Sequence, residues 1–203
     1  MPRNTLFGLI AAVAAALGLA VGAMLLQPKS TSIASGTLLQ TPRALPTFSL
    51  TDQDGQVFDN ARLNGHWTLV FAGFTYCPDI CPGTLTLLKA VKARLGPDAE
   101  KVQVLFLSVD PARDTPERLK TYVQFFDPGF LAATAPDAEL EKLARGMSFV
   151  YAKVPGATPE SYTMDHSTAL MLVNPQGQLA GFFTAPLKAD SLSADLKTIL
   201  GNG

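Results

Sequence analysis

The chain has 203 residues, with 16 lysines and arginines against 17 aspartates and glutamates, and 47% of its residues are hydrophobic. This length allows one ordinary domain plus an appendage, and the hydrophobic fraction is ample for a core. Because the charges nearly balance and no basic stripe or polybasic cluster occurs, the composition argues against nucleic acid as a partner. It also argues against a basic patch that binds anionic lipid.

The N-terminal region contains a long uncharged segment. Residues 6–26 carry no charge and are long enough to cross a bilayer as a helix. Val21-Gly22-Ala23 could instead be a signal-peptide cleavage site, but the mature chain would then begin with the apolar Met24. We therefore favour an uncleaved membrane anchor over residues 1–27. A single hydrophobic segment before a soluble region predicts export to a compartment where disulfides persist.

The rest of the chain divides into a linker and one domain. Residues 28–45 are rich in serine, threonine and proline and lack apolar periodicity, so they are predicted to form a tether. Residues 46–203 show no internal repeat and are predicted to form a single domain.

Within that domain, apolar patterns and turn signals predict alternating strands and helices. An Asp-Gly turn at Asp54-Gly55 predicts a short hairpin over residues 48–58. The remaining elements are predicted as buried strands at 67–74 and 102–109, helices at 83–95, 116–126, 137–145 and 191–200, and strands at 149–154, 168–173 and 179–183. Gly146 is the predicted stop of the third helix. This order predicts an α/β fold with a partly parallel sheet, whose sites gather at the carboxyl ends of strands.

The candidate chemistry centres on Cys77 and Cys81, the only two cysteines. On a helical turn their α-carbons would lie about 6 Å apart on one face, which suits either a disulfide or two thiolates converging on one metal ion. A purely structural disulfide would close a very short loop and stabilise little. Pro78 and Pro82 within this loop also indicate a shaped site between a strand and a helix.

One of the two histidines is a candidate metal ligand. His66 precedes the first core strand and is predicted to be a loop residue, whereas the strand after His166 could begin beside the cysteine loop. Two thiolates and one imidazole form a soft set that lacks the fourth ligand of a structural zinc site. The set favours copper, as Cu(I) or Cu(II), and zinc with an open position is the alternative.

Aspartates accompany these residues. Asp110 follows the second buried strand and is a candidate to face the site or a partner, while Asp114 could bond the cap of the next helix. Asp79 could raise the cysteine pKa values by adding negative charge, or could only order the loop. Asp165, next to His166, is a further candidate for contacting the ligands or a partner.

Three motifs follow one another along the chain. They are Phe74-Thr75-Tyr76-Cys77-Pro78-Asp79-Ile80-Cys81-Pro82, then Ser108-Val109-Asp110-Pro111-Ala112-Arg113-Asp114-Thr115-Pro116, then Met164-Asp165-His166-Ser167. In this order and spacing they resemble the SCO/SenC family of cytochrome c oxidase assembly proteins, over a match from about Pro46 to the C-terminus. The chain departs from the family pattern at Ala169-Leu170, where an aromatic residue is commoner, and at Asn174-Pro175, where Asp-Pro is usual.

The resemblance implies a thioredoxin-like fold on a single N-terminal transmembrane helix, with copper held by Cys77, Cys81 and His166. It implies a metallochaperone for the dinuclear copper centre of a cytochrome c oxidase subunit, with other copper chaperones or thiol reductases as further partners. The soluble domain would lie on the non-cytoplasmic side of the membrane, which is the periplasm in a bacterium.

Two other functions stay open. A membrane-tethered thiol–disulfide oxidoreductase, which would be an enzyme, would use Cys77 and Cys81 to reduce the cysteines of that centre or of other exported proteins. Three residues separate the cysteines here, against two in the usual thioredoxin motif, and the wider spacing favours an ion. When oxidised, the pair is predicted to form an intramolecular disulfide. A copper- or redox-responsive sensor is the third function, and the sequence shows no output domain for it.

Overall fold

The computed structural model describes residues 14–19, 22, 33–158 and 161–201. By its internal contacts the chain forms two units, Met1–Thr31 and Ser32–Gly203. Most of the predicted anchor at residues 6–26 lies outside the described residues. Within the described ranges, no helix combines the length and the apolar character that crossing a membrane requires.

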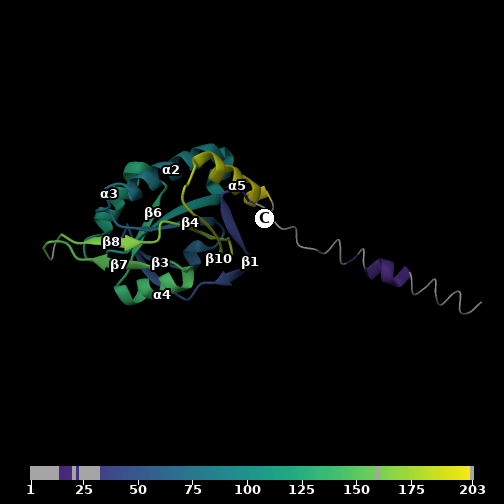
Figure 1. Ribbon diagram of the computed structural model, residues 1–203, viewed down its shortest axis with the longest axis horizontal. Helices are drawn as coiled ribbons and strands as arrows, with labels where there is room; N and C mark the ends of the chain where they lie inside the picture. The colour runs from purple at the N-terminus through teal and green to yellow at the C-terminus, as the bar shows by residue number, and fades with distance from the viewer. Residues whose placement is uncertain (1–13, 20–21, 23–32, 159–160, 202–203) are drawn as a thin grey trace, which may run out of the picture. The chain divides into compact units, whose positions relative to one another are not determined.

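A mixed sheet forms the centre of the second unit (Figure 1). Its strands are β1 (Gly36–Ala44), β2 (Ser49–Asp52), β3 (Val57–Asp59), β4 (Trp67–Gly73), β5 (Val102–Ser108), β6 (Leu131–Thr134), β9 (Leu170–Val173) and β10 (Gln178–Phe183). They lie in the order β1-β10-β9-β4-β5-β6-β2-β3, in which β4, β5 and β6 are parallel and the other pairs antiparallel. Two more strands, β7 (Tyr151–Val154) and β8 (Thr163–His166), pair only with each other as a hairpin.

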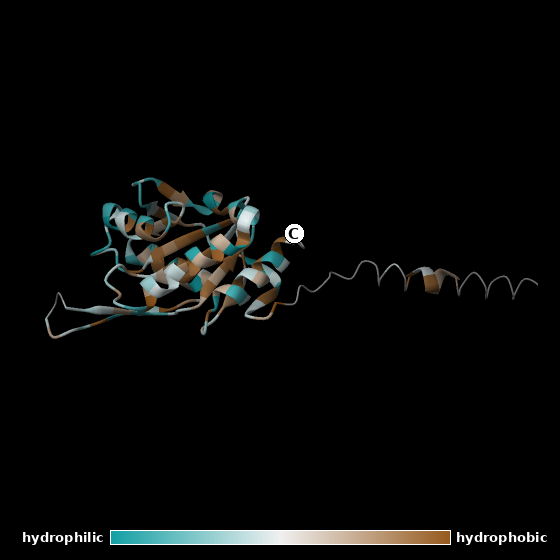
Figure 2. Ribbon diagram, turned by 90° about the horizontal axis from the view of Figure 1, so that it is seen from above, coloured by the Kyte–Doolittle hydropathy of each residue, from teal (hydrophilic) through white to brown (hydrophobic). Residues whose placement is uncertain are grey.

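Helices cover both faces of the sheet. The helices α2 (Ile80–Leu95), α3 (Pro116–Phe126) and α5 (Ala189–Gly201) lie on one face, and α4 (Asp137–Met147) lies on the other (Figure 1). Figure 2 shows central strands that are mainly hydrophobic and helices in which hydrophobic and hydrophilic residues alternate. Side chains alternate along a strand, so Phe71 of β4 joins the core under α2 while Val70 joins the core under α4. Burial on both faces explains why the central strands are continuous apolar runs.

The structure confirms the predicted α/β fold with a partly parallel sheet and an N-terminal hairpin. The hairpin is β2–β3, in which Leu50 pairs with Phe58, and Gly55 takes the positive φ of 72° that its turn requires. The strands predicted at 67–74 and 102–109 are β4 and β5. The helix start predicted around Thr115 is also correct, because the Thr115 side chain accepts from the Arg118 amide.

The predicted tether at residues 28–45 needs a correction, because β1 lies within it and pairs with β10. The segment just before β1 is also held, since the carboxylate of Asp195 in α5 accepts hydrogen bonds from the amides of Ala34 and Ser35. β1 is an edge strand whose register shifts between Leu38 and Arg43, and an edge strand needs little apolar alternation. The strand β1 was therefore not predicted, because the segment that contains it is rich in serine, threonine and proline.

The predicted end of the third helix is also wrong. α4 continues through Gly146 to Met147, and Ser148 takes the left-handed position with a φ of 58°. Glycine is needed at position 146 for packing rather than for ending the helix, because a Cβ there would collide with the ring of Pro46. Two strands, β6 and β8, were not predicted, since β6 reads Leu-Ala-Ala-Thr with two alanines and β8 contains a single apolar residue, Met164.

A buried carboxylate connects the ends of the two central strands. Asp114 is fully buried and accepts hydrogen bonds from the amide and hydroxyl of Thr75, at 3.0 and 2.6 Å, and from the hydroxyl of Ser108 at 2.6 Å. Thr75 Oγ1 in turn accepts from Arg118 Nε at 2.6 Å. Asp114 therefore fixes the loop after β4 rather than bonding the cap of α3.

We expect Asp114→Ala to lower the free energy of unfolding by about 3–5 kcal/mol, because three buried donors lose their acceptor. Chemical denaturation measures this change. Asp98→Ala is the matched control, since Asp98 forms a surface ion pair with Lys101 and its loss should cost less than about 1 kcal/mol. Equal effects of the two substitutions would contradict the assigned role of Asp114.

Candidate metal centre

The cysteine loop runs from the carboxyl end of β4 into the first turn of α2. Cys77 is half-buried in the loop and Cys81 is fully buried in the helix. Cys77 Sγ accepts the Cys81 amide at 3.5 Å, while Asp79 stands at the N-cap position without a capping hydrogen bond from its side chain. The sulfur of Cys77 thus occupies the amino end of the helix, where the helix dipole favours negative charge.

α2 begins earlier than predicted, at Ile80 rather than after Pro82 and Gly83. Pro82 is the third residue of the helix, where a backbone amide has no intrahelical partner, so proline is tolerated there. The early start matters because it places Cys81 inside the helix, facing the core. This helix start was not predicted because a Pro-Gly pair usually marks a turn rather than a position inside a helix.

His166 reaches the cysteine loop from the end of β8. Its Nε2 lies 3.7 Å from Cys81 Sγ, and its Nδ1 lies 3.0 Å from the carbonyl oxygen of Ser167. Because a carbonyl only accepts, Nδ1 carries the proton and the lone pair of Nε2 is directed at the sulfur. The rings of Phe71 and Phe74 pack edge-on against the imidazole at 6.1 and 6.0 Å between centroids. The histidine is thus oriented by one hydrogen bond and two rings.

Cys81 occupies a tightly packed position against β4. A Cβ at Gly73 would lie 2.9 Å from Cys81 Sγ and 2.7 Å from the Phe106 ring, so only glycine fits there. Burial raises the pKa of the Cys81 thiol, and the nearby Cys77 and Asp114 raise it further. Asp79 is exposed at the N-cap position of α2, and its predicted effect on the cysteine pKa values stays a prediction.

The separation of sulfur and nitrogen suits a shared ion. Cys81 Sγ and His166 Nε2 are 3.7 Å apart. A metal ion about 2.3 Å from the sulfur and about 2.0 Å from the nitrogen would have a sulfur–metal–nitrogen angle of about 120°. That angle is the one in a trigonal site of soft ligands. No group of three or more His, Cys, Asp or Glu side chains is arranged as a metal site in the parts of the chain that the structure covers. The Cys81–His166 pair has a spacing that suits an ion, and the ligand roles of Cys77, Cys81 and His166 stay predictions.

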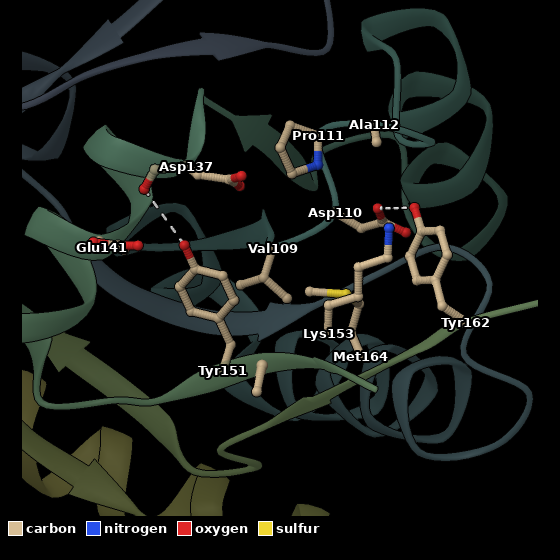
Figure 3. A pocket seen from close by; sticks show the side chains of 11 residues that line it. Val109, Asp110, Pro111, Ala112, Asp137, Glu141, Tyr151, Lys153, Tyr162 and Met164 are labelled. Atoms are coloured by element: carbon tan, nitrogen blue, oxygen red, sulfur yellow. Dashed lines mark hydrogen bonds between the residues drawn. The ribbon is translucent and has the colours of Figure 1, made fainter. Parts of the chain in front are cut away.

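The other predicted residues lie at different places around the loop. Asp110 is buried and accepts hydrogen bonds from Tyr162 Oη at 2.7 Å and from Arg113 Nε. It borders a cavity of about 340 Å³ (Figure 3). Asp165 is exposed and lines a shallow hollow next to His166. His66 is exposed at the amino end of β4, the opposite end from the cysteines, as expected of a loop residue.

Sequence reasoning missed three neighbours of the site, namely Tyr76, Arg113 and Tyr162. The Arg113 guanidinium lies over the rings of both tyrosines. Tyr76 and Arg113 are part of the motifs that resemble the SCO/SenC family. Their contacts join segments far apart in the chain, so no spacing within one segment could have revealed them.

Comparisons with known proteins identify the family of this chain. Residues 37–201 match the model of the SCO1/SenC family. A protein of Stutzerimonas stutzeri named as a candidate copper-binding protein is 40% identical over 167 residues, which cover 81% of each chain.

Two solved structures share the fold. ScoI of Arabidopsis thaliana with copper bound has a TM-score of 0.71 and 33% identity, covering 77% of this chain and 98% of that one. ScoI of Bradyrhizobium japonicum with copper bound has a TM-score of 0.69 and 37% identity, covering 76% and 98%. These likenesses confirm the expected thioredoxin-like fold. With a family model that matches most of its length and relatives above 30% identity, this chain belongs to the SCO1/SenC family.

Proposed function

We propose that this protein is a copper metallochaperone that holds one copper ion through Cys77, Cys81 and His166. The observation that carries the proposal is the 3.7 Å approach of a lone-pair-bearing His166 Nε2 to Cys81 Sγ. The two ScoI structures, both solved with copper bound, support copper over zinc. We further propose that the recipient is the dinuclear copper centre of a cytochrome c oxidase subunit, with other copper chaperones or thiol reductases as additional partners.

The exposure of the three side chains suits a protein that passes its ion on. Cys81 is fully buried, whereas Cys77 and His166 are half-buried. An incoming thiolate of a recipient can therefore approach from the side of Cys77 and His166 and replace them one at a time. The neighbouring side chains of Tyr76 and Ile80 are 49% and 50% exposed and offer apolar contact area around that opening.

The membrane anchor and the compartment are also proposals. We propose that residues 6–26 anchor the protein and that the domain lies on the non-cytoplasmic side, in the periplasm of a bacterium. The support is the uncharged run in the sequence. With β1 as part of the domain, the tether between anchor and domain shortens to the residues before Ile33.

A thiol–disulfide reductase is the second candidate, and one observation favours it. Cys77 lies half-exposed at a helix amino end, as a nucleophilic thiol does, with Cys81 buried behind it. The Cys77 thiolate would attack a substrate disulfide and release one substrate thiolate. Cys81, deprotonated, would then attack the mixed disulfide, releasing the second and leaving the Cys77–Cys81 disulfide. His166 forms no bond to sulfur in this sequence, and the lone pair of its Nε2 would only accept the Cys81 proton, so a reductase depends on this histidine less than a copper donor does.

The ligand assignment predicts unequal effects of the two histidines. We expect His166→Ala to weaken binding of Cu(II) at least about tenfold, because the imidazole is lost, whereas His66→Ala should leave it unchanged. Competition titration with a chelator of known affinity measures both variants. If the two variants bound copper alike, the assignment of His166 would be wrong.

Copper affinity should also depend on pH. Because the pKa of Cys81 is raised in the folded protein, its thiol is protonated at neutral pH and must lose that proton when copper binds. Between about pH 6 and about pH 8 the affinity should therefore rise as pH rises, by up to about tenfold per unit for each proton released. Titrations at several pH values measure the slope, which Cys81→Ser should reduce. An affinity that stays constant over this range would argue against thiolate ligation.

A cellular assay separates the two candidate functions. A reductase should tolerate His166→Ala because both cysteines remain, whereas a copper donor should fail. We expect His166→Ala to impair oxidase maturation nearly as much as Cys77→Ser, with the largest deficit when copper is scarce. Oxidase activity at matched protein levels and several copper concentrations is the readout. Normal activity in His166→Ala together with loss in Cys77→Ser would establish the reductase instead.

A further inference from the structure

Five side chains next to the metal centre alternate between cations and aromatic rings. Arg118 lies 4.0 Å from the ring centre of Tyr76, and Arg113 lies 4.6 Å from Tyr76 and 3.6 Å from Tyr162. Lys153 Nζ lies 3.7 Å from the ring centre of Tyr162. We call these five residues the cation–aromatic stack. A cation over an aromatic face is attracted by the quadrupole of the ring, and the attraction grows when water is excluded.

Arg113, the central member, also makes directional hydrogen bonds. Its Nε donates to the Asp110 carboxylate and its Nη1 donates to the Tyr162 carbonyl oxygen at 3.0 Å. Tyr162 Oη closes the ring by donating to Asp110 Oδ1 at 2.7 Å, and Figure 3 shows the two side chains facing each other. The side chains of Arg113 and Asp110 are only 18% and 3% exposed, so these charge-assisted bonds are little screened.

The stack joins the two segments that carry the ligands. Tyr76 immediately precedes Cys77, and Tyr162 lies just before β8, the strand that ends at His166. The hairpin β7–β8 has no strand pairing with the main sheet. Side-chain contacts must therefore hold it, and Arg113 contacts the hairpin through Tyr162 and the cysteine loop through Tyr76 at the same time.

Arg113 has a feature that stability alone does not explain. Its Nη2 is buried without a hydrogen-bond partner among the described residues. A buried, unpaired donor is destabilising, because it gives up its hydrogen bonds to water and gains none in the protein. A site that tolerates this cost is typical of a residue kept for geometry at a functional centre.

We infer that Arg113 is a positioning residue that holds the His166-bearing hairpin against the cysteine loop and thereby brings the imidazole to the sulfurs. The inference rests on the proposed copper function for its consequence, but its structural part concerns the metal-free protein. Without Arg113 the hairpin is held less firmly against the cysteine loop. Copper would then stay bound to the sulfurs of Cys77 and Cys81, while His166 Nε2 would be bound to it for only part of the time.

Arg113→Ala and Arg113→Lys test the inference, with Arg62→Ala as the matched control. Arg62 makes the same two kinds of contact far from the site, an ion pair with Asp52 at 3.4 Å and a ring contact with Phe58 at 5.1 Å. Lysine keeps the charge of Arg113 but cannot hold Asp110 and the Tyr162 carbonyl in one rigid fork, so it should have an intermediate effect. Circular dichroism first checks that each variant is folded. If Arg113→Ala does not fold, the measurements are made on Arg113→Lys alone.

Two measurements distinguish positioning from general stability. In the metal-free protein, amide hydrogen exchange should become faster in β7 and β8 for the Arg113 variants and stay unchanged in β4 and β5. In the Cu(II) form, the imidazole nitrogen splitting in the electron paramagnetic resonance spectrum should weaken. The affinity for Cu(II) should fall about 10- to 100-fold, as for other residues that orient a metal ligand. Arg62→Ala should change neither measurement.

Unchanged exchange in β7 and β8 in a folded Arg113 variant would overturn the inference, and so would an unchanged nitrogen signal in a protein that binds copper. If the unmodified protein showed no copper binding or no nitrogen signal, the proposed function would fail instead. The hydrogen-exchange measurement would still decide whether Arg113 holds the hairpin.

Discussion

The parallel pairing of β4 with β5 is the constraint from which the site follows. The two strands pair residue by residue from Trp67 with Val102 to Gly73 with Ser108, and the Val109 amide extends the ladder by donating to the Gly73 carbonyl. Parallel strands end at the same edge of a sheet, so the cysteine loop and the loop of Asp110 must leave side by side. Every contact between these loops depends on that shared edge.

Two local features convert this edge into a defined geometry. Gly73 at the end of β4 leaves room for the sulfur of Cys81, so the first turn of α2 can pack directly onto the strand. Asp114, reaching back from the far end of the β5–α3 loop, binds Thr75 and fixes the start of the cysteine loop. The position of both sulfurs is therefore determined by the main sheet. The position of the imidazole is determined separately, by a hairpin outside that sheet.

This division also decides what the sequence could predict. The central strands could be predicted from their long apolar runs and the helices from the helical spacing of their apolar residues. The cysteine pair could be predicted as a site from its spacing of four residues. His166 could be predicted as a ligand candidate because it precedes a strand that could begin beside the cysteine loop, and because its motif resembles that of the SCO/SenC family. Two strands were missed: β8, on which His166 lies, contains a single apolar residue, and β1 is a polar edge strand. Arg113 was missed because its function depends on three segments meeting in space, which no local pattern encodes.

The contrast between Cys81 and its neighbours is suited to an ion that must be both held and released. Burial keeps Cys81 protonated in the metal-free protein, since a bare thiolate there would lack solvation. In the proposed complex, a Cu(I) ion at Cys81 would offset the charge of the thiolate, so copper would replace the proton at little electrostatic cost. If a recipient drew the ion toward the exposed side, as proposed above, a proton would return to Cys81 and disfavour rebinding. A fully exposed thiol, with a pKa of about 8.5, would also regain a proton at neutral pH, but less completely than the buried Cys81, because solvent stabilises its thiolate.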